Sequence, residues 1–360
     1  MSRFFVHPEI EKAETISKDV YLSESVFDES REKIFSPSWQ FIGDTERVRD
    51  SGDVYPFTLH EHYLNEPLLL TRDKQGTIHC LSNVCTHRGN ILVEKACNLH
   101  QLQCRYHGRR FQLDGRFSYM PEFKEVENFP AERDHLYSLP VFQWGKWLFT
   151  TLGLQREASF CFGDMINRMS WLPIEEFQFR PDLSKDYVVE ANWALYCENY
   201  LEGFHIPFVH ASLNEAIDYG SYTTELFPYS CLQLGLAKDG ESAFELPNTS
   251  SDYGKKVGGY YFWIFPNLMF NFYPWGLSIN MVKPVNVSKT KISFLTYVWD
   301  ESKLEQGAGS DLFRVEMEDE EIVQAVQKGI RSRFYSHGRY SVTREQGTHH
   351  FHKLLAEALG

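Results

Sequence analysis

Two mixed pairs of cysteine and histidine stand close together in the first third of the chain. The first is Cys85-Thr-His87 and the second is Cys104-Arg-Tyr-His107, with sixteen residues between them. Two thiolates and two imidazoles suit a [2Fe–2S] cluster in which two histidines replace two cysteines on one iron. That replacement raises the reduction potential to roughly −150 to +300 mV, from about −400 mV for plant-type ferredoxins. The four residues therefore predict a protein that handles single electrons.

A structural zinc site is the main alternative for these four side chains, because zinc also binds two cysteines with two histidines. Zinc fingers usually place like ligands together, as a pair of cysteines followed by a pair of histidines. Here each pair is mixed, and the surrounding sequence is rich in strand-forming residues. We therefore favour the iron–sulfur cluster over zinc.

The sequence around the four ligands resembles the two boxes of Rieske proteins, C-T-H-R-G and C-x-Y-H-G. The corresponding residues are Cys85-Thr-His-Arg-Gly89 and Cys104-Arg-Tyr-His-Gly108. In ring-hydroxylating oxygenases the second box commonly reads C-P-Y-H-G-W, whereas this chain has Arg105 and Arg109 in place of proline and tryptophan. The resemblance implies the four ligands named above, and we expect the two added cations to raise the potential of the cluster or to alter its docking surface.

A second dense group of ionisable residues is Glu198-Asn-Tyr-Leu-Glu202-Gly-Phe-His205-Ile-Pro-Phe-Val-His210. On a regular α-helix, residues five apart point about 140° away from each other, so His205 and His210 would not bind one ion. Pro207 stands between them and is incompatible with an undisturbed helix interior. A wide turn or a π-like distortion would bring both imidazoles to one side. With one carboxylate they would form the facial triad of non-haem Fe(II) oxygenases.

The pattern E/D-x-x-H-x-x-x-x-H downstream of a Rieske box is similar to that of the oxygenase component of Rieske non-haem iron oxygenases. This resemblance extends over essentially the whole chain. It implies mononuclear Fe(II) held by His205, His210 and an acidic residue of a C-terminal helix. Asp319 matches the liganding aspartate of the family, and Glu318 and Glu320 are the alternatives in the same acidic run. Without the resemblance, that run would be interpreted as a solvated helix N-terminus, favourable to the helix dipole.

Glu202 lies three residues before His205, a spacing that places two side chains on one face of a helix. The simplest role for its carboxylate is to orient the imidazole of His205. The family resemblance implies a further role, in which this acid links the iron site to His107 of a neighbouring subunit within a head-to-tail homotrimer. Most members of the family have aspartate at this position, and glutamate is typical of the branch that acts on quaternary amines.

The elements that must position these residues change in character along the chain. Residues 9–36 are charged and mostly helical in pattern, whereas residues 39–151 have the pattern of short strands joined by turns. From residue 152 onward, longer strands and helices are mixed, which favours an α+β domain. We expect helices over residues 192–204, 316–333 and 349–359.

The resemblance also implies how these parts are arranged. An all-β Rieske [2Fe–2S] domain, residues 39–151, is expected to be inserted near the N-terminus of a helix-grip catalytic domain of the START or Bet v1 type. Residues 1–38 would form the N-terminal helical part of that catalytic domain. Residues 152–360 would form its body, with the mononuclear iron site.

The composition of the chain limits the classes of partner. It carries 36 basic and 49 acidic residues, a formal net charge of −13, which argues against binding to nucleic acid or to an anionic membrane. No stretch approaches the roughly 18 uncharged apolar residues of a membrane span, and the N-terminus lacks the apolar core of a signal peptide. Seven scattered cysteines do not suggest a disulfide framework, so we expect a reducing cytoplasm.

Several further stretches, among them His337-Gly-Arg339 and Gly347-Thr-His-His-Phe-His352, resemble carnitine, glycine-betaine and choline monooxygenases. The resemblance implies O₂-dependent monooxygenation of a quaternary-ammonium or related small substrate, by hydroxylation next to nitrogen with C–N cleavage or N-demethylation. Five aromatic residues are candidates for a cage that holds the cationic head by cation–π contact: Phe204, Phe270, Phe272, Tyr273 and Trp275.

The source of electrons must lie outside the chain. No G-x-G-x-x-G follows a strand, so we expect a separate NAD(P)H-dependent flavin or ferredoxin reductase. Within enzymes, the alternative is an aromatic ring-hydroxylating dioxygenase or an O-demethylase with the same iron site. A Rieske electron carrier without oxygenase activity is less favoured, because more than half of the chain follows the β-rich block.

Overall fold

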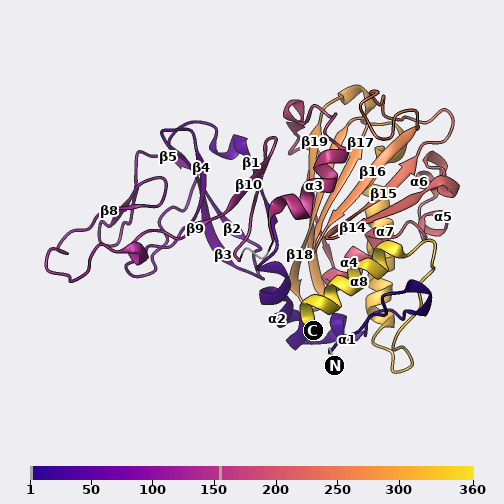
Figure 1. The fold of residues 1–360 in the computed structure, drawn as a ribbon, viewed down its shortest axis with the longest axis horizontal. Helices are drawn as coiled ribbons and strands as arrows, with labels where there is room; N and C mark the ends of the chain where they lie inside the picture. The colour runs from indigo at the N-terminus through magenta and orange to yellow at the C-terminus, as the bar shows by residue number, and fades with distance from the viewer. Residues whose placement is uncertain (1–2, 154–155) are drawn as a thin grey trace. The chain divides into compact units, whose positions relative to one another are not determined.

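The computed structural model describes residues 3–153 and 156–360. The chain divides into two compact units, one of Ser36–Gln155 and the other of Met1–Phe35 together with Arg156–Gly360. The first unit is built from strands and interrupts the second, which combines helices with one large antiparallel sheet (Figure 1). The expected α+β class is confirmed, with a β-domain inserted near the N-terminus of a mixed domain.

Three small antiparallel sheets form the unit Ser36–Gln155, which we call the cluster domain. The largest has the order β5-β2-β3-β4-β9, with bounds Cys97–Asn98, Asp53–Leu59, Glu66–Arg72, Ile78–Ser82 and Ser138–Leu139. A second has the order β1-β11-β10, with bounds Gln40–Asp44, Trp147–Thr150 and Val141–Trp144. The third has the order β6-β7-β8, with bounds Leu102–Gln103, Arg110–Phe111 and Phe117–Tyr119.

Strand β3 contributes to two hydrophobic cores, which explains why three consecutive leucines in it are fully buried. Successive side chains of a strand point to opposite faces. Leu69 packs in one core with Cys85 and Cys104, whereas Leu68 and Leu70 pack in the other. The two cysteines are therefore held in place by the core of their own domain.

One antiparallel sheet organises the second unit, which we call the catalytic domain. Its order is β12-β19-β18-β17-β16-β15-β14, and β13 also pairs with β19. The bounds, from β12 to β19, are Gln178–Phe179, Lys185–Val189, Thr223–Phe227, Ser230–Leu236, Val257–Ile264, Leu268–Tyr273, Gly276–Asn286 and Lys289–Val298. From β14 to β19, strands that follow one another in the sequence are also neighbours in the sheet, drawn in orange in Figure 1.

Helices pack against this sheet and complete the catalytic domain. From α1 to α8 their bounds are Asp19–Leu22, Glu24–Ser30, Ala158–Arg168, Trp193–Tyr200, Ile206–Val209, Ala211–Ala216, Leu312–Gly329 and Gln346–Leu359. Helix α8 places Phe351 against Trp263 of β16 and Trp193 of α4, with ring centroids 5.3 and 5.9 Å apart. Helix α4 contacts β18 and α7 contacts β13, so the helices that carry the site are fixed to the sheet.

All three expected helices have different bounds: the helix expected from residue 349 begins at Gln346, and side-chain capping explains where the first of the others ends and where the second begins. The helix expected over residues 192–204 ends at Tyr200, because the carboxylate of Glu202 accepts the N–H groups of Phe204 and His205 and so begins a new turn. The helix expected from residue 316 begins earlier, at Leu312. There the side chain of Asp311 accepts the N–H of Arg314 at 3.2 Å.

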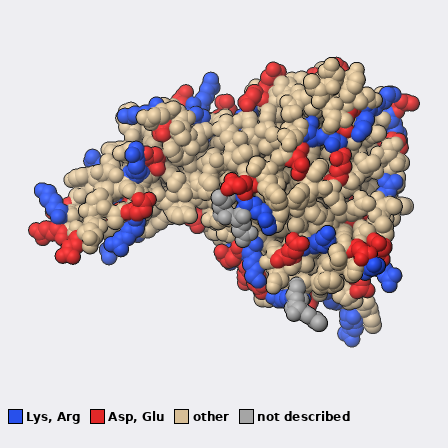
Figure 2. Space-filling view, in the orientation of Figure 1, with Lys and Arg blue, Asp and Glu red and all other residues tan. Residues whose placement is uncertain are grey.

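Surface charge is distributed evenly on the face of the molecule that Figure 2 shows. On the face shown in Figure 2, acidic and basic side chains are interspersed rather than gathered by sign. Among the helices of residues 3–153 and 156–360, none has the length and apolar character needed to cross a membrane. None of the seven cysteines, all of them among the described residues, forms a disulfide, and six of them are buried.

Candidate metal centres

Two loops with the same hydrogen-bond pattern present Cys85 and Cys104. In each loop the cysteine N–H donates to the carbonyl five residues further on, at 2.9 and 2.8 Å. The N–H of the glycine four residues further on donates back to the cysteine carbonyl at 3.0 Å. These glycines, Gly89 and Gly108, have φ values of +68° and +74°, which side chains rarely adopt. The two boxes therefore fold into equivalent turns although their histidines stand at different positions.

The four predicted cluster ligands come together at these loops. Cys85 and Cys104 are each 2 % exposed, and the rings of His87 and His107 have centroids 4.7 Å apart. Nδ1 of His107 is buried without a hydrogen-bond partner. Burial, followed by the neighbouring Cys104, raises the pKa of Cys85. A buried imidazole nitrogen without a partner, beside two buried and adjacent cysteines, fits a metal cluster that binds all of them.

The two arginines of the second box occupy different environments. Arg109 is 2 % exposed and donates to Oδ1 of Asp134 at 2.7 Å, with its guanidinium near the rings of Phe117 and Phe129. Arg105 is largely exposed and pairs with a surface glutamate, Glu94, at 2.5 Å. Each cation therefore has its own carboxylate, which opposes its effect on a nearby cluster. A raised cluster potential stays a prediction, to be checked by redox titration of Arg105→Pro.

Asp134→Asn should destabilise the cluster domain by about 3–5 kcal/mol, because it leaves the guanidinium of Arg109 buried without its counter-charge. Urea unfolding of the full chain, followed by the visible circular dichroism of the cluster, would measure the loss. Glu94→Gln is the matched control, since it breaks an exposed pair whose contribution is about 1 kcal/mol or less. Equal effects of the two substitutions would contradict a structural role for the buried pair.

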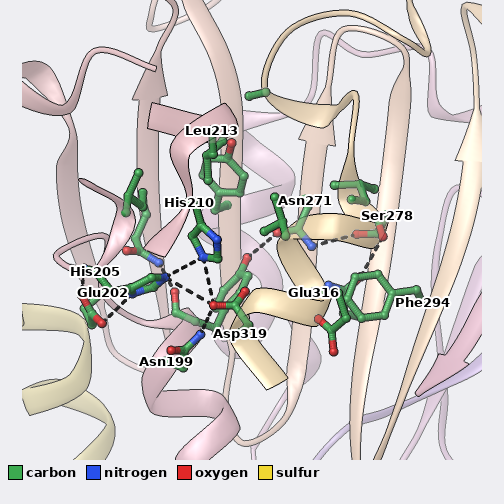
Figure 3. A pocket seen from close by; sticks show the side chains of 18 of the residues that line it. Asn199, Glu202, His205, His210, Leu213, Asn271, Ser278, Phe294, Glu316 and Asp319 are labelled. Carbon is green, nitrogen blue, oxygen red and sulfur yellow. Dashed lines mark hydrogen bonds and ion pairs between the residues drawn. The ribbon is translucent and has the colours of Figure 1, made fainter. Parts of the chain in front are cut away.

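In the catalytic domain, His205, His210 and Asp319 are brought together as the sequence predicts. Nε2 of His210 lies 3.1 Å from Nε2 of His205 and 3.0 Å from Oδ1 of Asp319, and the remaining pair of atoms is 3.5 Å apart. Bonds of about 2.1 Å at right angles would place neighbouring donor atoms about 3.0 Å apart. These three atoms therefore fit one face of an octahedral metal ion (Figure 3).

The chain path explains how two histidines five residues apart meet. His205 immediately precedes α5, which is a single turn, and His210 immediately follows it. The backbone of His210, at φ −109° and ψ 82°, leaves the helical conformation before α6 begins. The expected wide turn is thus a break between two short helices, and the alternative of a π-like distortion is wrong at this position.

Two glutamates orient the two imidazoles by contacting Nδ1, the ring nitrogen that does not face the proposed metal site. Nδ1 of His205 lies 2.7 Å from Oε1 of Glu202, and Nδ1 of His210 lies 2.8 Å from Oε2 of Glu318. Both Nε2 atoms are thereby directed toward Asp319, whose Oδ1 also accepts a hydrogen bond from Asn199 at 2.6 Å. Carboxylates that hold the outer nitrogen of a histidine are typical of metal sites.

These contacts refine the expectations for the acidic residues. Glu202 reaches His205 by capping the turn that precedes α5, so the expected shared helix face is not the reason for their contact. Glu318, an alternative ligand, instead contacts the outer nitrogen of His210. Burial by itself would lower the pKa of His210, but hydrogen bonds to Asp319 and Glu318 raise it. A negative environment of this kind favours a bound cation.

A cavity of about 100 Å³ adjoins the three donor atoms. Its wall includes a row of side chains across four strands of the sheet, in which Gln233 pairs with Tyr261, Tyr261 with Asn271, and Asn271 with Ser278. Residues of α4 and α7 complete the lining, among them Tyr196 and Glu316. Glu316 and Asp319 of α7 are labelled in Figure 3. A small molecule in this cavity would therefore lie between the sheet and the proposed metal ligands.

Comparison with known proteins identifies the family. Residues 176–360 match the family described as ring hydroxylating alpha subunit (catalytic domain), and residues 38–130 match the Rieske [2Fe-2S] domain. The chain belongs to the ring hydroxylating alpha subunit family. It is therefore a Rieske non-haem iron oxygenase, and its cofactors are a [2Fe–2S] cluster and mononuclear iron.

Individual relatives of this ring hydroxylating alpha subunit align over nearly all of it. It is 28% identical to the chloroplastic choline monooxygenase of Arabidopsis thaliana, over 96% of this chain and 83% of that protein. It is 25% identical to the carnitine monooxygenase oxygenase subunit of Escherichia coli (strain K12), over 96% and 94% of the two chains. The structure of the quaternary ammonium Rieske monooxygenase CntA has the same fold, with a TM-score of 0.79, 22% identity and coverage of 98% and 97%.

The sequence alone did not identify most of the residues that line the cavity of this ring hydroxylating subunit. Of the five candidate aromatic residues, Tyr273 lines it, whereas Phe270 and Phe272 alternate with Asn271 and point to the opposite face of β17. Phe204 and Trp275 are also outside the lining among the described residues. The aromatic wall consists instead of Tyr196, Tyr200, Tyr222, Tyr261, Tyr273 and Phe294. Amide side chains within otherwise apolar strands, such as Asn271, were the signal available in the sequence.

Proposed function

We propose that this Rieske oxygenase hydroxylates a carbon next to nitrogen in a quaternary-ammonium or related small substrate, with C–N cleavage or N-demethylation. The observation that carries the proposal is the lining of the cavity. It combines five tyrosines with three carboxylates, those of Glu202, Glu316 and Asp319. The faces of tyrosine rings and carboxylate groups both attract a desolvated cation. The names of the choline and carnitine monooxygenases support the same class of substrate.

In this proposal each residue has a defined task. Cys85, Cys104, His87 and His107 hold the cluster, and His205, His210 and Asp319 hold the iron, which supplies the chemistry of O₂ reduction. Glu202 and Glu318 keep the two imidazoles in the orientation that points Nε2 at the metal. The tyrosine-lined cavity excludes water and places the substrate next to the three ligand atoms.

The route of the electrons is the second part of the proposal. A separate NAD(P)H-dependent flavin or ferredoxin reductase supplies them to the cluster. Glu202 then connects the iron site with His107 of a neighbouring subunit in a homotrimer. The position of Glu202 supports this role, because its Oε1 contacts Nδ1 of His205 and its side chain remains 16 % exposed. We assign the assembly to the cytoplasm because none of the seven cysteines, all of them among the described residues, forms a disulfide.

A turnover screen tests the proposed substrate class. The iron-loaded enzyme, with a reductase and NAD(P)H, should consume O₂ in the presence of choline, L-carnitine or glycine betaine and release an aldehyde or trimethylamine. Naphthalene and aromatic acids serve as the contrasting substrates. Turnover restricted to the aromatic compounds would replace the proposal with a ring-hydroxylating dioxygenase or an O-demethylase.

A further inference from the structure

Glu316 is a buried carboxylate that lines the cavity and has one oxygen without a hydrogen-bond partner. It is 2 % exposed and lies one turn before Asp319 on α7. The hydroxyl of Tyr196 donates to its Oε2 at 2.5 Å, whereas its Oε1 is buried without a hydrogen-bond partner. A buried carboxylate oxygen without a partner is unfavourable unless a ligand completes it. The cavity that Glu316 lines is the space from which such a ligand would come.

The other two carboxylates of the cavity are already engaged. Glu202 holds the imidazole of His205, and Asp319 contacts both histidines and Asn199. Among the described residues that line the cavity there is no lysine or arginine. Glu316 is therefore the carboxylate that remains for a ligand, and a ligand carboxylate would meet three acids without any basic side chain.

The charge of Glu316 depends on what occupies the cavity. Burial raises the pKa of Glu316; the hydrogen bond from Tyr196 opposes this rise, whereas the nearby Asp319 and Glu320 add to it. A cation beside Oε1 would favour the ionised form, because opposite charges in a site of low dielectric attract strongly. A neutral ligand of the same shape would provide no such attraction.

We propose that Glu316 is the residue that recognises the positive charge of the substrate, and that the preferred substrates are cations without a carboxylate. The inference rests on the proposed function, since it concerns the same cavity. It predicts that choline-like amino alcohols and simple alkylammonium ions bind more tightly than zwitterions such as glycine betaine and L-carnitine. The competing role for Glu316 is structural, as a buried acceptor that fixes only Tyr196.

Direct binding to the iron-loaded enzyme tests this role. Isothermal titration calorimetry would compare choline with 3,3-dimethylbutan-1-ol, which has the same shape but a carbon in place of the charged nitrogen. The wild-type enzyme should bind choline at least about tenfold more tightly than the neutral analogue, and more tightly than glycine betaine. In Glu316→Gln the preference for choline over the neutral analogue should fall to about twofold or less. Choline should bind more weakly, and the affinity for the neutral analogue should not change.

The controls keep the outcomes separate. Glutamine retains an oxygen for Tyr196, and unchanged iron content would show that the variant is folded. Glu320→Gln removes a buried acid from the same helix but outside the cavity, so it should keep the wild-type preference. An unchanged preference in Glu316→Gln, or tighter binding of zwitterions by the wild type, overturns the inference alone. Failure of the wild type to bind any ammonium compound overturns the proposed function itself.

Discussion

Replacing His205 by alanine should leave the holoenzyme with about two irons per chain in place of about three, and should reduce turnover at least about 100-fold. His205 supplies one of three donor atoms that lie 3.0–3.5 Å from one another, and two remaining donors are a poor site for Fe(II). The cluster belongs to a separate unit of the chain, so its absorbance and the EPR signal of its reduced form should be unchanged.

Iron analysis and EPR on the same sample would measure both effects. His337→Ala, which removes an exposed histidine of the catalytic domain, should retain about three irons and full turnover. The ligand assignment would be contradicted by a His205→Ala protein that keeps its mononuclear iron. Loss of the cluster in that variant would contradict the independence of the two centres.

Glu202→Gln should slow electron transfer from the reduced cluster to the iron by at least about 100-fold, while both centres stay bound. Oε1 of Glu202 contacts Nδ1 of His205, while Oε2 accepts the N–H groups of Phe204 and His205. A carboxylate has about four acceptor positions, so Oε1 can accept a second histidine as well. In glutamine one of the two oxygens becomes an NH₂ group, so the side chain cannot keep the backbone contacts and accept from two histidines. Single-turnover mixing of cluster-reduced enzyme with O₂ and substrate would give the rate.

The chain provides a matched control for this experiment. Glu318 holds Nδ1 of His210 at 2.8 Å, just as Glu202 holds Nδ1 of His205 at 2.7 Å. If Glu202 acted solely by orienting its histidine, Glu318→Gln and Glu202→Gln would reduce the rate equally. We expect Glu318→Gln to weaken iron binding by about tenfold and to leave electron transfer in the iron-loaded fraction near the wild-type rate.

The proximity of the four proposed cluster ligands could be predicted from the sequence because it depends on short loops. Each cysteine, its histidine and its glycine lie within five residues, and the hydrogen bonds that close the two turns are local. The histidine pair was also within reach of sequence reasoning, since Pro207 excludes a regular helix between His205 and His210. Here the structure adds the break in the backbone at His210.

Residues whose roles depend on distant contacts were harder to predict. The acidic run of α7 offers three neighbouring carboxylates, and only the packing of α7 beside α4 decides that Asp319 faces the histidines while Glu318 contacts the outer side of His210. The cavity wall depends on the register of β15 to β18, which pairs Gln233 with Tyr261 and Asn271 with Ser278. Asn271 and Ser278 lie across one short hairpin, whereas the pairing of Gln233 with Tyr261 spans a long connection and leaves no local pattern that would reveal it.

The alternation along β17 has a consequence for how this enzyme can change. Asn271 and Tyr273 face the cavity, whereas Phe270 and Phe272 are fully buried on the other side of the same strand. Substrate range and thermal tolerance are therefore encoded by different, interleaved positions. Laboratory evolution that randomises only the cavity-facing residues would leave the apolar layer of the sheet intact. New substrates can thus be explored along this strand without dismantling the scaffold that carries the metal.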